Sequence, residues 1–313
     1  MRAVMRRVLL ASTLLASLSA GCGEEPSRFT RSDAAVGPDD VAVALDAGAE
    51  DVAPTPLDVG TIPLRDTGPM LDDVLVYAHS DDTLYSVDPR TNRLTRIGDF
   101  TYPRGMTVGN MTDIAVDAEG NITGTTSITG GASGYVWRIN PRTAACTQVV
   151  DLPDGRNFVA LTWVPAGTVH PTEETLVGGT TDGTLWRIDL ANGRASQLFV
   201  LPRASGQTWQ ISGDIVSVAG ATYITLRRSG MNTDVLGVVD FDARSLRIVN
   251  TSGVGFGSVY AIGYWRQTLY GFTRAGEFIT IDARTGTGRR VSMPAMQFSG
   301  AGVTTVVSTL PPP

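Results

Sequence analysis

The sequence predicts an all-β protein built from a repeated unit, and three observations support that prediction. The first is a short pattern that returns five times, in which a β-branched residue precedes an Asp or Asn and a turn follows. These positions are Asp88, Asn140, Asp189, Asp240 and Asp282. They lie 52, 49, 51 and 42 residues apart, a period that indicates one supersecondary unit per copy.

The second observation is the strand content of each copy. The residue before the Asp or Asn is always Val or Ile, and another hydrophobic residue stands four positions before the Asp or Asn, as expected of a buried strand. Around Asn140 the chain predicts four strands separated by turns, at 113–116, 122–124, 136–139 and 146–150. Four short strands per unit are typical of a β-propeller blade.

The third observation concerns register and closure. Segments 75–88, 176–189 and 269–282 align without gaps, at offsets of 101 and 194 residues. The first copy supplies only three strands, between Val74 and Phe100, whereas 300–307 predicts a strand without a partner. Pairing this C-terminal strand into blade one, as its innermost strand, removes the open sheet edges. The predicted fold is therefore a five-bladed β-propeller of four-stranded blades over residues 72–308, followed by a tail at 309–313.

One segment of the first copy resembles a known family of repeats. Residues 76–79 (VYAH), followed by 84–92 (LYSVDPRTN), are similar to the repeat of the YVTN and lactonase-like propellers. The resemblance covers roughly residues 73–308 as a style of repeat. Because unrelated activities share that style, it implies the fold and leaves the activity open.

The first 22 residues predict an export signal. Arg2, Arg6 and Arg7 precede an apolar run that is too short for a stable membrane-spanning helix. The run ends at Cys22 in the sequence LSAGC, which resembles the bacterial lipobox and implies lipidation of Cys22; the family prefers Leu where Ser19 stands. The residue after the cysteine, Gly23, implies an outer-membrane lipoprotein that faces the periplasm or the cell surface. The alternative is an ordinary signal peptide with an incidental cysteine.

Residues 23–71 predict a disordered acidic tether. They combine Ala, Gly and Pro with an excess of acidic residues and show no hydrophobic period, so they cannot bury enough apolar surface to offset the entropy of ordering. Most of the net charge of −6 lies there, which leaves the propeller close to neutral. A neutral propeller argues against a nucleic-acid partner and against electrostatic membrane binding by the domain. We therefore expect a monomer that contacts the membrane through its N-terminal lipid only.

Composition excludes several kinds of chemistry. All 25 basic residues are arginine, so mechanisms that need a lysine are excluded. With Cys22 lipidated, Cys146 has no disulfide partner, and its position in a predicted strand indicates a buried structural thiol. No zinc cluster or haem motif can be assembled. We expect no cofactor, with a Ca²⁺ ion on paired carboxylates as the open exception.

Ligands of propellers usually bind at the mouth formed by the loops between blades and by the turns between the second and third strands. Arginine and aromatic side chains there favour an anionic or glycan ligand, because they supply bidentate hydrogen bonds and stacking. The candidate ligand-binding residues are Arg156, Asn157, Arg203, Trp209, Gln210, Arg228 and Arg274. The alternative for Trp209, as for Phe158 and Phe298, is packing between blades.

Two carboxylates and a histidine are the alternative catalytic residues. Asp113 and Asp214 lie 101 residues apart, at equivalent positions of blades two and four, and His79 lies near the same end of blade one. The five-bladed glycosidases of the arabinanase-like group are similar, but they use three carboxylates, and the third is missing here. A structural role, in which each Asp accepts backbone N–H bonds, is the competing interpretation.

Two classes of function therefore remain. The first is a non-catalytic propeller that binds a glycan, a small anionic ligand or a protein. The second is an exported hydrolase of lactonase or glycosidase type that uses Asp113, Asp214 and His79.

Overall fold

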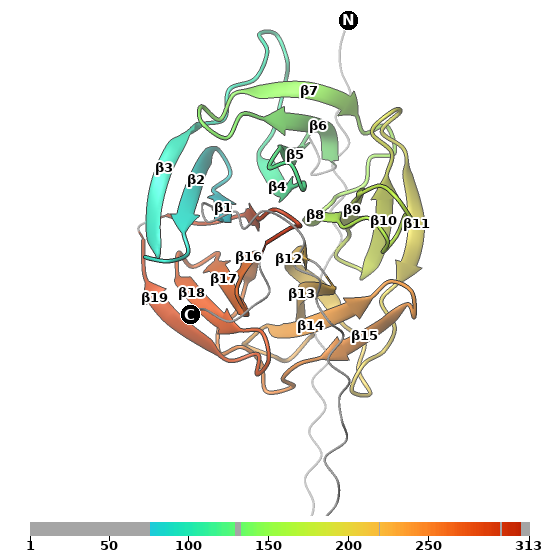
Figure 1. Cartoon of the computed structure of the whole chain (residues 1–313), viewed down its shortest axis with the longest axis vertical. Helices are drawn as coiled ribbons and strands as arrows, with labels where there is room; N and C mark the ends of the chain where they lie inside the picture. The colour runs from blue at the N-terminus through green and yellow to red at the C-terminus, as the bar shows by residue number, and fades with distance from the viewer. Residues whose placement is uncertain (1–75, 129–132, 219, 295, 308–313) are drawn as a thin grey trace, which may run out of the picture. The chain divides into compact units, whose positions relative to one another are not determined.

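The computed structural model describes residues 76–128, 133–218, 220–294 and 296–307 as twenty β-strands in five four-stranded antiparallel sheets (Figure 1). The predicted signal peptide with Cys22, the tether and the tail all lie outside the described residues. Blade 1 contains β20 (Gly300–Gly302), β1 (Val76–His79), β2 (Thr83–Asp88) and β3 (Arg93–Asp99). Blade 2 contains β4 (Met111–Val116), β5 (Ile122–Ser127), β6 (Ser133–Ile139) and β7 (Cys146–Asp151).

The other three blades follow in chain order. Blade 3 contains β8 (Ala160–Val164), β9 (Thr175–Gly179), β10 (Thr184–Ile188) and β11 (Ala195–Val200). Blade 4 contains β12 (Gln210–Val218), β13 (Ala221–Arg227), β14 (Val235–Asp240) and β15 (Ser245–Ile248). Blade 5 contains β16 (Val259–Trp265), β17 (Thr268–Thr273), β18 (Phe278–Asp282) and β19 (Gly288–Ser292). The predicted all-β, five-bladed propeller is confirmed.

The ring closes in blade 1, as predicted. The C-terminal strand β20 pairs with β1, opposing Ala301 to Ala78 and Gly300 to His79. The strand is shorter than the predicted 300–307, because the chain leaves the ladder after Gly302. The following residues are still anchored: the Thr304 hydroxyl donates to the Asp117 carbonyl at 2.8 Å, and the Thr305 hydroxyl donates to Glu174. The C-terminal segment therefore ties blade 1 to blades 2 and 3.

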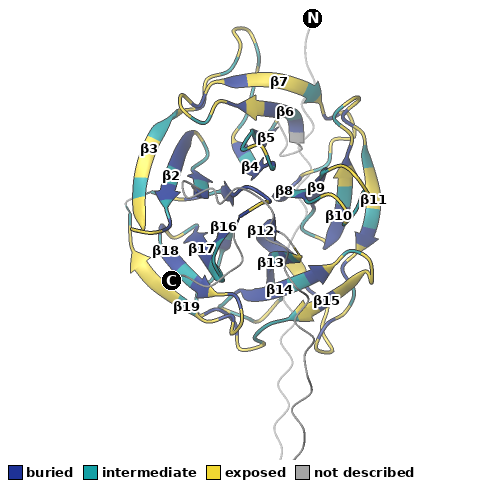
Figure 2. Cartoon of the chain, in the orientation of Figure 1, coloured by how far each residue is buried: buried dark blue, intermediate teal, exposed yellow. Residues whose placement is uncertain are grey.

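The five innermost strands β20, β4, β8, β12 and β16 contact their neighbours around the central axis. Burial falls from the axis outward, and the outermost strands such as β7 and β19 are largely exposed (Figure 2). The aromatic residues expected between blades are buried: Phe158 and Phe298 are almost inaccessible, and Trp209 is 3% exposed. Stability therefore comes mainly from apolar surface buried between adjacent sheets.

The repeated Asp or Asn has a defined structural role. Its side-chain oxygen accepts a backbone N–H two or three residues later and so fixes the tight turn after the third strand of each blade. The accepted bonds are Arg90 N to Asp88, Arg142 N to Asn140, Ala191 N to Asp189, Ala243 N to Asp240 and Arg284 N to Asp282, all at 2.8–2.9 Å. This requirement explains why the pattern recurs in all five blades.

Cys146 begins β7 and is a buried free thiol, as the sequence predicts. Burial raises the pKa of the Cys146 thiol to about 12, so the reactive thiolate is disfavoured.

The described residues contain no helical segment with the length and hydrophobicity of a membrane span.

Candidate functional site

A cavity of about 350 Å³ opens at one end of the ring, and all five blades contribute to it. One set of lining residues comes from the innermost strands and the segments that lead into them: Asn110, Thr112, Asn157, Ser212, Tyr260 and Ser299. The second set comes from the ends of the second strands and the turns that follow them: Asp81, Ser127, Thr181, Arg227 and Arg274. These segments include the two groups of loops from which the sequence predicts the mouth. We call this cavity the axial mouth.

Three of the innermost strands are irregular where they line the axial mouth. The pairing register shifts between Met111 and Asp113 in β4, between Ile211 and Ile215 in β12, and between Val259 and Ala261 in β16. Residues in these bulges leave the regular ladder and are redirected toward the cavity. Such bulges are common beside functional sites.

Asp113 lies one residue beyond the mouth residue Thr112 and is completely buried. Its Oδ1 accepts the backbone N–H of Ile114 at 2.8 Å. Its Oδ2 accepts the backbone N–H of Leu161, in blade 3, at 2.6 Å. The carboxyl group therefore links blade 2 to blade 3.

Asp214 occupies the equivalent position of blade 4 and is also completely buried. Its Oδ1 accepts the N–H of Ile215 at 2.6 Å, and its Oδ2 accepts the N–H groups of Ile262 at 2.6 Å and Ala301 at 3.2 Å. Those last two donors belong to blades 5 and 1. Asp214 therefore holds three blades together at the axis.

The two buried carboxyl groups interact directly, and two such neighbours share one proton because both cannot be ionised together. Burial raises the pKa of Asp113 well above its ordinary range, and the adjacent Asp214 charge raises it further. Burial also raises the pKa of Asp214, but its backbone N–H bonds act in the opposite direction. Because Asp214 accepts three backbone N–H groups and Asp113 accepts two, we assign the shared proton to Asp113.

The shared proton predicts a pH-dependent difference between the wild type and Asp113→Asn. Asp113 keeps its proton to higher pH in the folded protein than in the unfolded chain, where its pKa is near 3.8. Its stabilising contribution is therefore complete below pH 3.8 and is lost as pH rises to the raised folded pKa, by about 1.4 kcal/mol per pH unit. Urea denaturation at several pH values should show the wild-type advantage over Asp113→Asn shrinking as pH rises. A constant difference would contradict the shared proton.

His79 makes the stability of the protein depend on pH with the sign opposite to that of Asp113. Burial lowers the pKa of His79 from its ordinary value of 6.5 to about 4, so the ring favours a neutral state. Stability from this residue falls as pH drops from 6.5 toward 4, because the unfolded chain takes up a proton that the folded protein does not. Since His79 is present in both proteins, its contribution largely cancels in the comparison above.

His79 lies beside the carboxylate pair, so the three alternative catalytic residues converge. Its Nδ1 lies 2.7 Å from the Ser80 carbonyl, which assigns the ring proton to Nδ1. Its Nε2 lies 3.9 Å from Asp113 Oδ1 and has no hydrogen-bond partner among the described residues. All three side chains are fully buried, and none lines the axial mouth.

Gly300 makes this convergence sterically feasible. A Cβ at this position would overlap both Asp113 Oδ1 and His79 Nε2. Within the described residues, no group of three or more His, Cys, Asp or Glu side chains is arranged to hold a metal ion.

One side of the axial mouth contains a closed polar network. Arg274 donates from Nη1 to Asp81 Oδ1 at 3.0 Å and to Ser299 Oγ at 2.9 Å. The Asn110 amide donates to Asp81 Oδ2 at 3.0 Å, and Ser299 Oγ donates to Asp81. Burial would raise the pKa of Asp81, but the hydrogen bonds from Arg274 and Ser299 outweigh it and lower the pKa. Asp81 is thus an ionised acceptor paired with Arg274.

The predicted ligand-binding residues divide between the mouth and other surfaces. Asn157 and Arg274 line the axial mouth. Arg156 stacks 3.6 Å over the Trp186 ring, and Arg203 donates to the Gly206 carbonyl at 2.5 Å.

The others lie near the N-terminal end of β12 without lining the cavity. Trp209 is buried and donates from Nε1 to the Ala204 carbonyl at 2.9 Å. Arg228 lies 5.8 Å from the centre of the Trp209 ring, and its Nε lies 3.2 Å from Met231 Sδ. Gln210 is an exposed residue that pairs with Arg227 across the ladder.

The sequence patterns do not identify Asp81, Thr181, Arg227 or Tyr260 as ligand-binding candidates. Arg227 is the last residue of β13, whereas the sequence predicts its neighbour Arg228 as the ligand-binding residue. Successive strand residues point to opposite faces, so an error of one residue at a strand end exchanges a mouth residue for an outer one. The pairing of Gln210 with Arg227 would have resolved the choice, but it depends on a bulge in β12.

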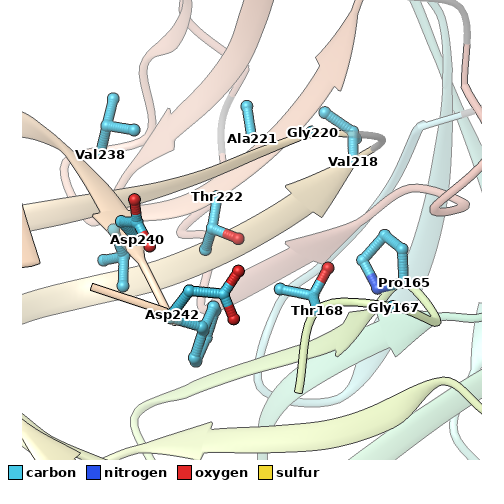
Figure 3. A pocket seen from close by; sticks show the side chains of 12 residues that line it. Pro165, Gly167, Thr168, Val218, Gly220, Ala221, Thr222, Val238, Asp240 and Asp242 are labelled. Atoms are coloured by element: carbon cyan, nitrogen blue, oxygen red, sulfur yellow. The ribbon is translucent and has the colours of Figure 1, made fainter. Parts of the chain in front are cut away.

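A second cavity, of about 290 Å³, lies among β12, β13, β14 and the segment between β8 and β9 (Figure 3). Asp240, Asp242, Thr168 and Thr222 supply its polar side chains. Asp240 is already used by the turn, since it accepts the Ala243 N–H at 2.8 Å. Thr222 is hydrogen-bonded to Ser217 at 2.8 Å. This cavity therefore ranks below the axial mouth as a functional site.

Comparisons with known proteins yield only distant structural similarities. No family model and no curated protein matches the sequence. Similar solved structures include an oligogalacturonate lyase in complex with manganese, at 11% identity and a TM-score of 0.38, covering 72% of this chain and 63% of that one. Another is an auxiliary nutrient binding protein from Bacteroides thetaiotaomicron, at 11% identity and a TM-score of 0.39, covering 69% and 53%.

A third is a protein of unknown function from Bacteroides caccae, at 8% identity and a TM-score of 0.42, covering 74% of this chain and 98% of that one. The chain spans less than two thirds of the lyase and of the nutrient binding protein. Identities and scores this low carry no argument about a ligand or a reaction. The chain is a five-bladed β-propeller, and its function has to be inferred from its own axial mouth.

Proposed function

We propose that this protein is a non-catalytic binding module whose small polar ligand occupies the axial mouth. The supporting observation is the mouth itself, a cavity of about 350 Å³ to which all five blades contribute polar side chains. A concave site with convergent polar groups is the usual form of a ligand site.

The state of the buried acids favours binding over catalysis. A general acid or base must reach the proton that it transfers. Asp113 and Asp214 are fully buried, and each oxygen already accepts at least one backbone N–H. In this proposal the pair holds the blades together beneath the mouth.

Filling the mouth should abolish binding without unfolding the ring. Thr181→Trp places a large side chain in the cavity from the turn between β9 and β10. Thr147→Trp, on the exposed outermost strand β7, is the matched control. A thermal-shift screen of sugars and polar metabolites should find ligands that stabilise the wild type and the control but not Thr181→Trp. Ligands that stabilise all three proteins equally would place the binding site elsewhere.

The alternative function is an exported hydrolase of lactonase or glycosidase type. The convergence of His79, Asp113 and Asp214 beneath the mouth favours it, because clustered residues with shifted pKa values are typical of active sites. It requires an opening of the axis that exposes these groups. Turnover of chromogenic lactones or glycosides that is lost in Asp113→Asn, with the fold retained, would establish this alternative over the binding module.

We further propose that the propeller is exported and tethered to the outer membrane through a lipid on Cys22. The lipobox-like sequence before Cys22 and the acidic segment 23–71 support this proposal. Its membrane contact is then the lipid alone, and the propeller is a monomer that binds no nucleic acid.

Lipidation predicts a simple fractionation result. Cys22→Ser should move the protein from the membrane fraction to the soluble fraction, because the acyl chains supply the membrane affinity. Mass spectrometry of the mature N-terminus should detect acyl chains on the wild type only. Unchanged fractionation together with an unmodified wild-type N-terminus would leave the ordinary signal peptide as the explanation.

A further inference from the structure

The polar side chains that line the axial mouth differ in whether they have hydrogen-bond partners. On the side formed by blades 5, 1 and 2, Asp81, Arg274, Ser299 and Asn110 bond to one another. Each of these four side chains therefore already has at least one partner within the mouth.

The side formed by blades 3, 4 and 5 differs. Asn157, Thr181, Arg227 and Tyr260 all line the cavity there. Within the described part of the chain, none of these four side chains has a hydrogen-bond partner. Convergent polar groups without partners are what a hydrogen-bonding ligand requires.

The charge on this side of the axial mouth favours an anionic ligand. The negative charge of Asp81 is paired with Arg274 at 3.0 Å, which leaves Arg227 as the cation of the cavity without an ion pair among the described residues. The carboxylate that acts electrostatically on Arg227 is Asp234, which is buried. Its Oδ2 accepts from Ser212 Oγ and from the Val259 N–H, both at 2.7 Å. No hydrogen bond or ion pair joins the Arg227 guanidinium to Asp234 or to any other described residue, so the guanidinium donors of Arg227 remain available to a ligand.

From this arrangement we infer that the ligand is a small anion rich in hydroxyl groups, such as a sugar acid, whose carboxylate binds Arg227. This inference rests on the proposed function of the axial mouth. A guanidinium matches a carboxylate with two parallel hydrogen bonds, and the Asn157, Thr181 and Tyr260 side chains supply neutral partners for hydroxyl groups. A cavity of about 350 Å³ is at the small end of the range for ligand sites and suits a monosaccharide.

Two matched comparisons test the inference by titration calorimetry. The probes are glucuronate and glucose, which differ by a carboxylate, with inorganic phosphate as a simple anion. The variants are Arg227→Gln and Arg227→Lys, with Arg228→Gln as the control, because Arg228 is adjacent in sequence but lies toward Trp209. Thr181→Trp serves as the blocked mouth.

Glucuronate should bind the wild type and Arg228→Gln equally, and it should bind Arg227→Gln at least roughly tenfold more weakly. Arg227→Lys should recover only part of the loss, since an ammonium group lacks the bidentate geometry. Glucose should bind at least roughly tenfold more weakly than glucuronate and should be insensitive to Arg227→Gln.

Three results with the named probes would overturn the inference. They are equal affinity for glucose and glucuronate, an unchanged glucuronate affinity in Arg227→Gln, and no binding of glucuronate at millimolar concentration, whether or not phosphate binds. A neutral ligand that binds more tightly than glucuronate, that Thr181→Trp excludes and that Arg227→Gln does not affect would also overturn it, while leaving the proposed function intact. A ligand whose binding is not weakened by Thr181→Trp would contradict both the inference about the sugar acid and the proposed function of the axial mouth.

Discussion

Replacing Asp214 with Ala should destabilise the propeller by roughly 3–5 kcal/mol, which for a ring of this size lowers Tm by roughly 6–20 °C. The substitution leaves the N–H groups of Ile215, Ile262 and Ala301 without their acceptor and leaves Asp113 without its partner. Buried polar groups that lose their partners cost more than the net value of the hydrogen bonds themselves. Thermal and urea unfolding monitored by circular dichroism measure the effect.

Matched controls distinguish this structural role of Asp214 from a loss of stability that would follow the removal of any carboxylate. Asp242→Ala removes an exposed carboxylate from the turn after β14 and should change stability by no more than about 0.5 kcal/mol. Asp113→Asn should cost less than Asp214→Asn, because Asp113 accepts two backbone N–H groups and Asp214 accepts three. An Asp214→Ala protein as stable as Asp242→Ala would refute the structural role of the pair.

Deletion of residues 299–313 should prevent cooperative folding. It removes β20, which leaves β1 as an unpaired edge at the axis. It also removes the hydrogen bonds between Ala301 and Asp214 and between Ser299 and Arg274. Exposed strand edges promote aggregation, so the truncated chain should appear in the void volume on size-exclusion chromatography or unfold without a sharp transition.

Deletion of residues 311–313 alone leaves β20 and its contacts in place and is the control. This shorter truncation should unfold like the full chain. If the protein truncated after residue 298 is soluble and unfolds cooperatively, β20 is dispensable for closure and the five-bladed count loses its support.

The sequence was sufficient to predict the fold because the repeat encodes it locally. Each Asp or Asn, such as Asp88, accepts a backbone N–H in its own turn, so its requirement appears in every copy. Closure was also predictable, since three strands in the first copy and one spare strand at the end can pair in one way that leaves no open edge. The early end of β20 at Gly302 was not predictable, because the Thr304 and Thr305 hydroxyls, rather than ladder bonds, hold 303–307 against the Asp117 carbonyl of blade 2 and Glu174 of blade 3.

The candidate site was only partly predictable. Equivalent positions in the repeat indicated that Asp113 and Asp214 lie near the axis, but their depth was not evident. Depth depends on what surrounds the side chain, and here Gly300 lets the acids approach His79 beneath the mouth. Such contacts join residues far apart in the chain, and no local pattern encodes them.

The sequence could not assign the residues of the axial mouth where the end of a strand was uncertain by one position. Arg227 and Arg228 are identical in type, and only the pairing of β13 with the bulged β12 shows which one lines the cavity. The unsatisfied state of Asn157, Thr181 and Tyr260 could likewise be recognised only when the partners of the neighbouring network were known.

A crystal structure of the protein with glucuronate bound tests the central claim most directly. We predict electron density for the sugar acid in the axial mouth, with its carboxylate on Arg227 and its hydroxyl groups near Asn157 and Tyr260, above an Asp113–Asp214 pair that remains buried. Density in the cavity of Figure 3 instead, or a ligand in direct contact with exposed Asp113 and Asp214, would contradict the account of the mouth as a non-catalytic binding site.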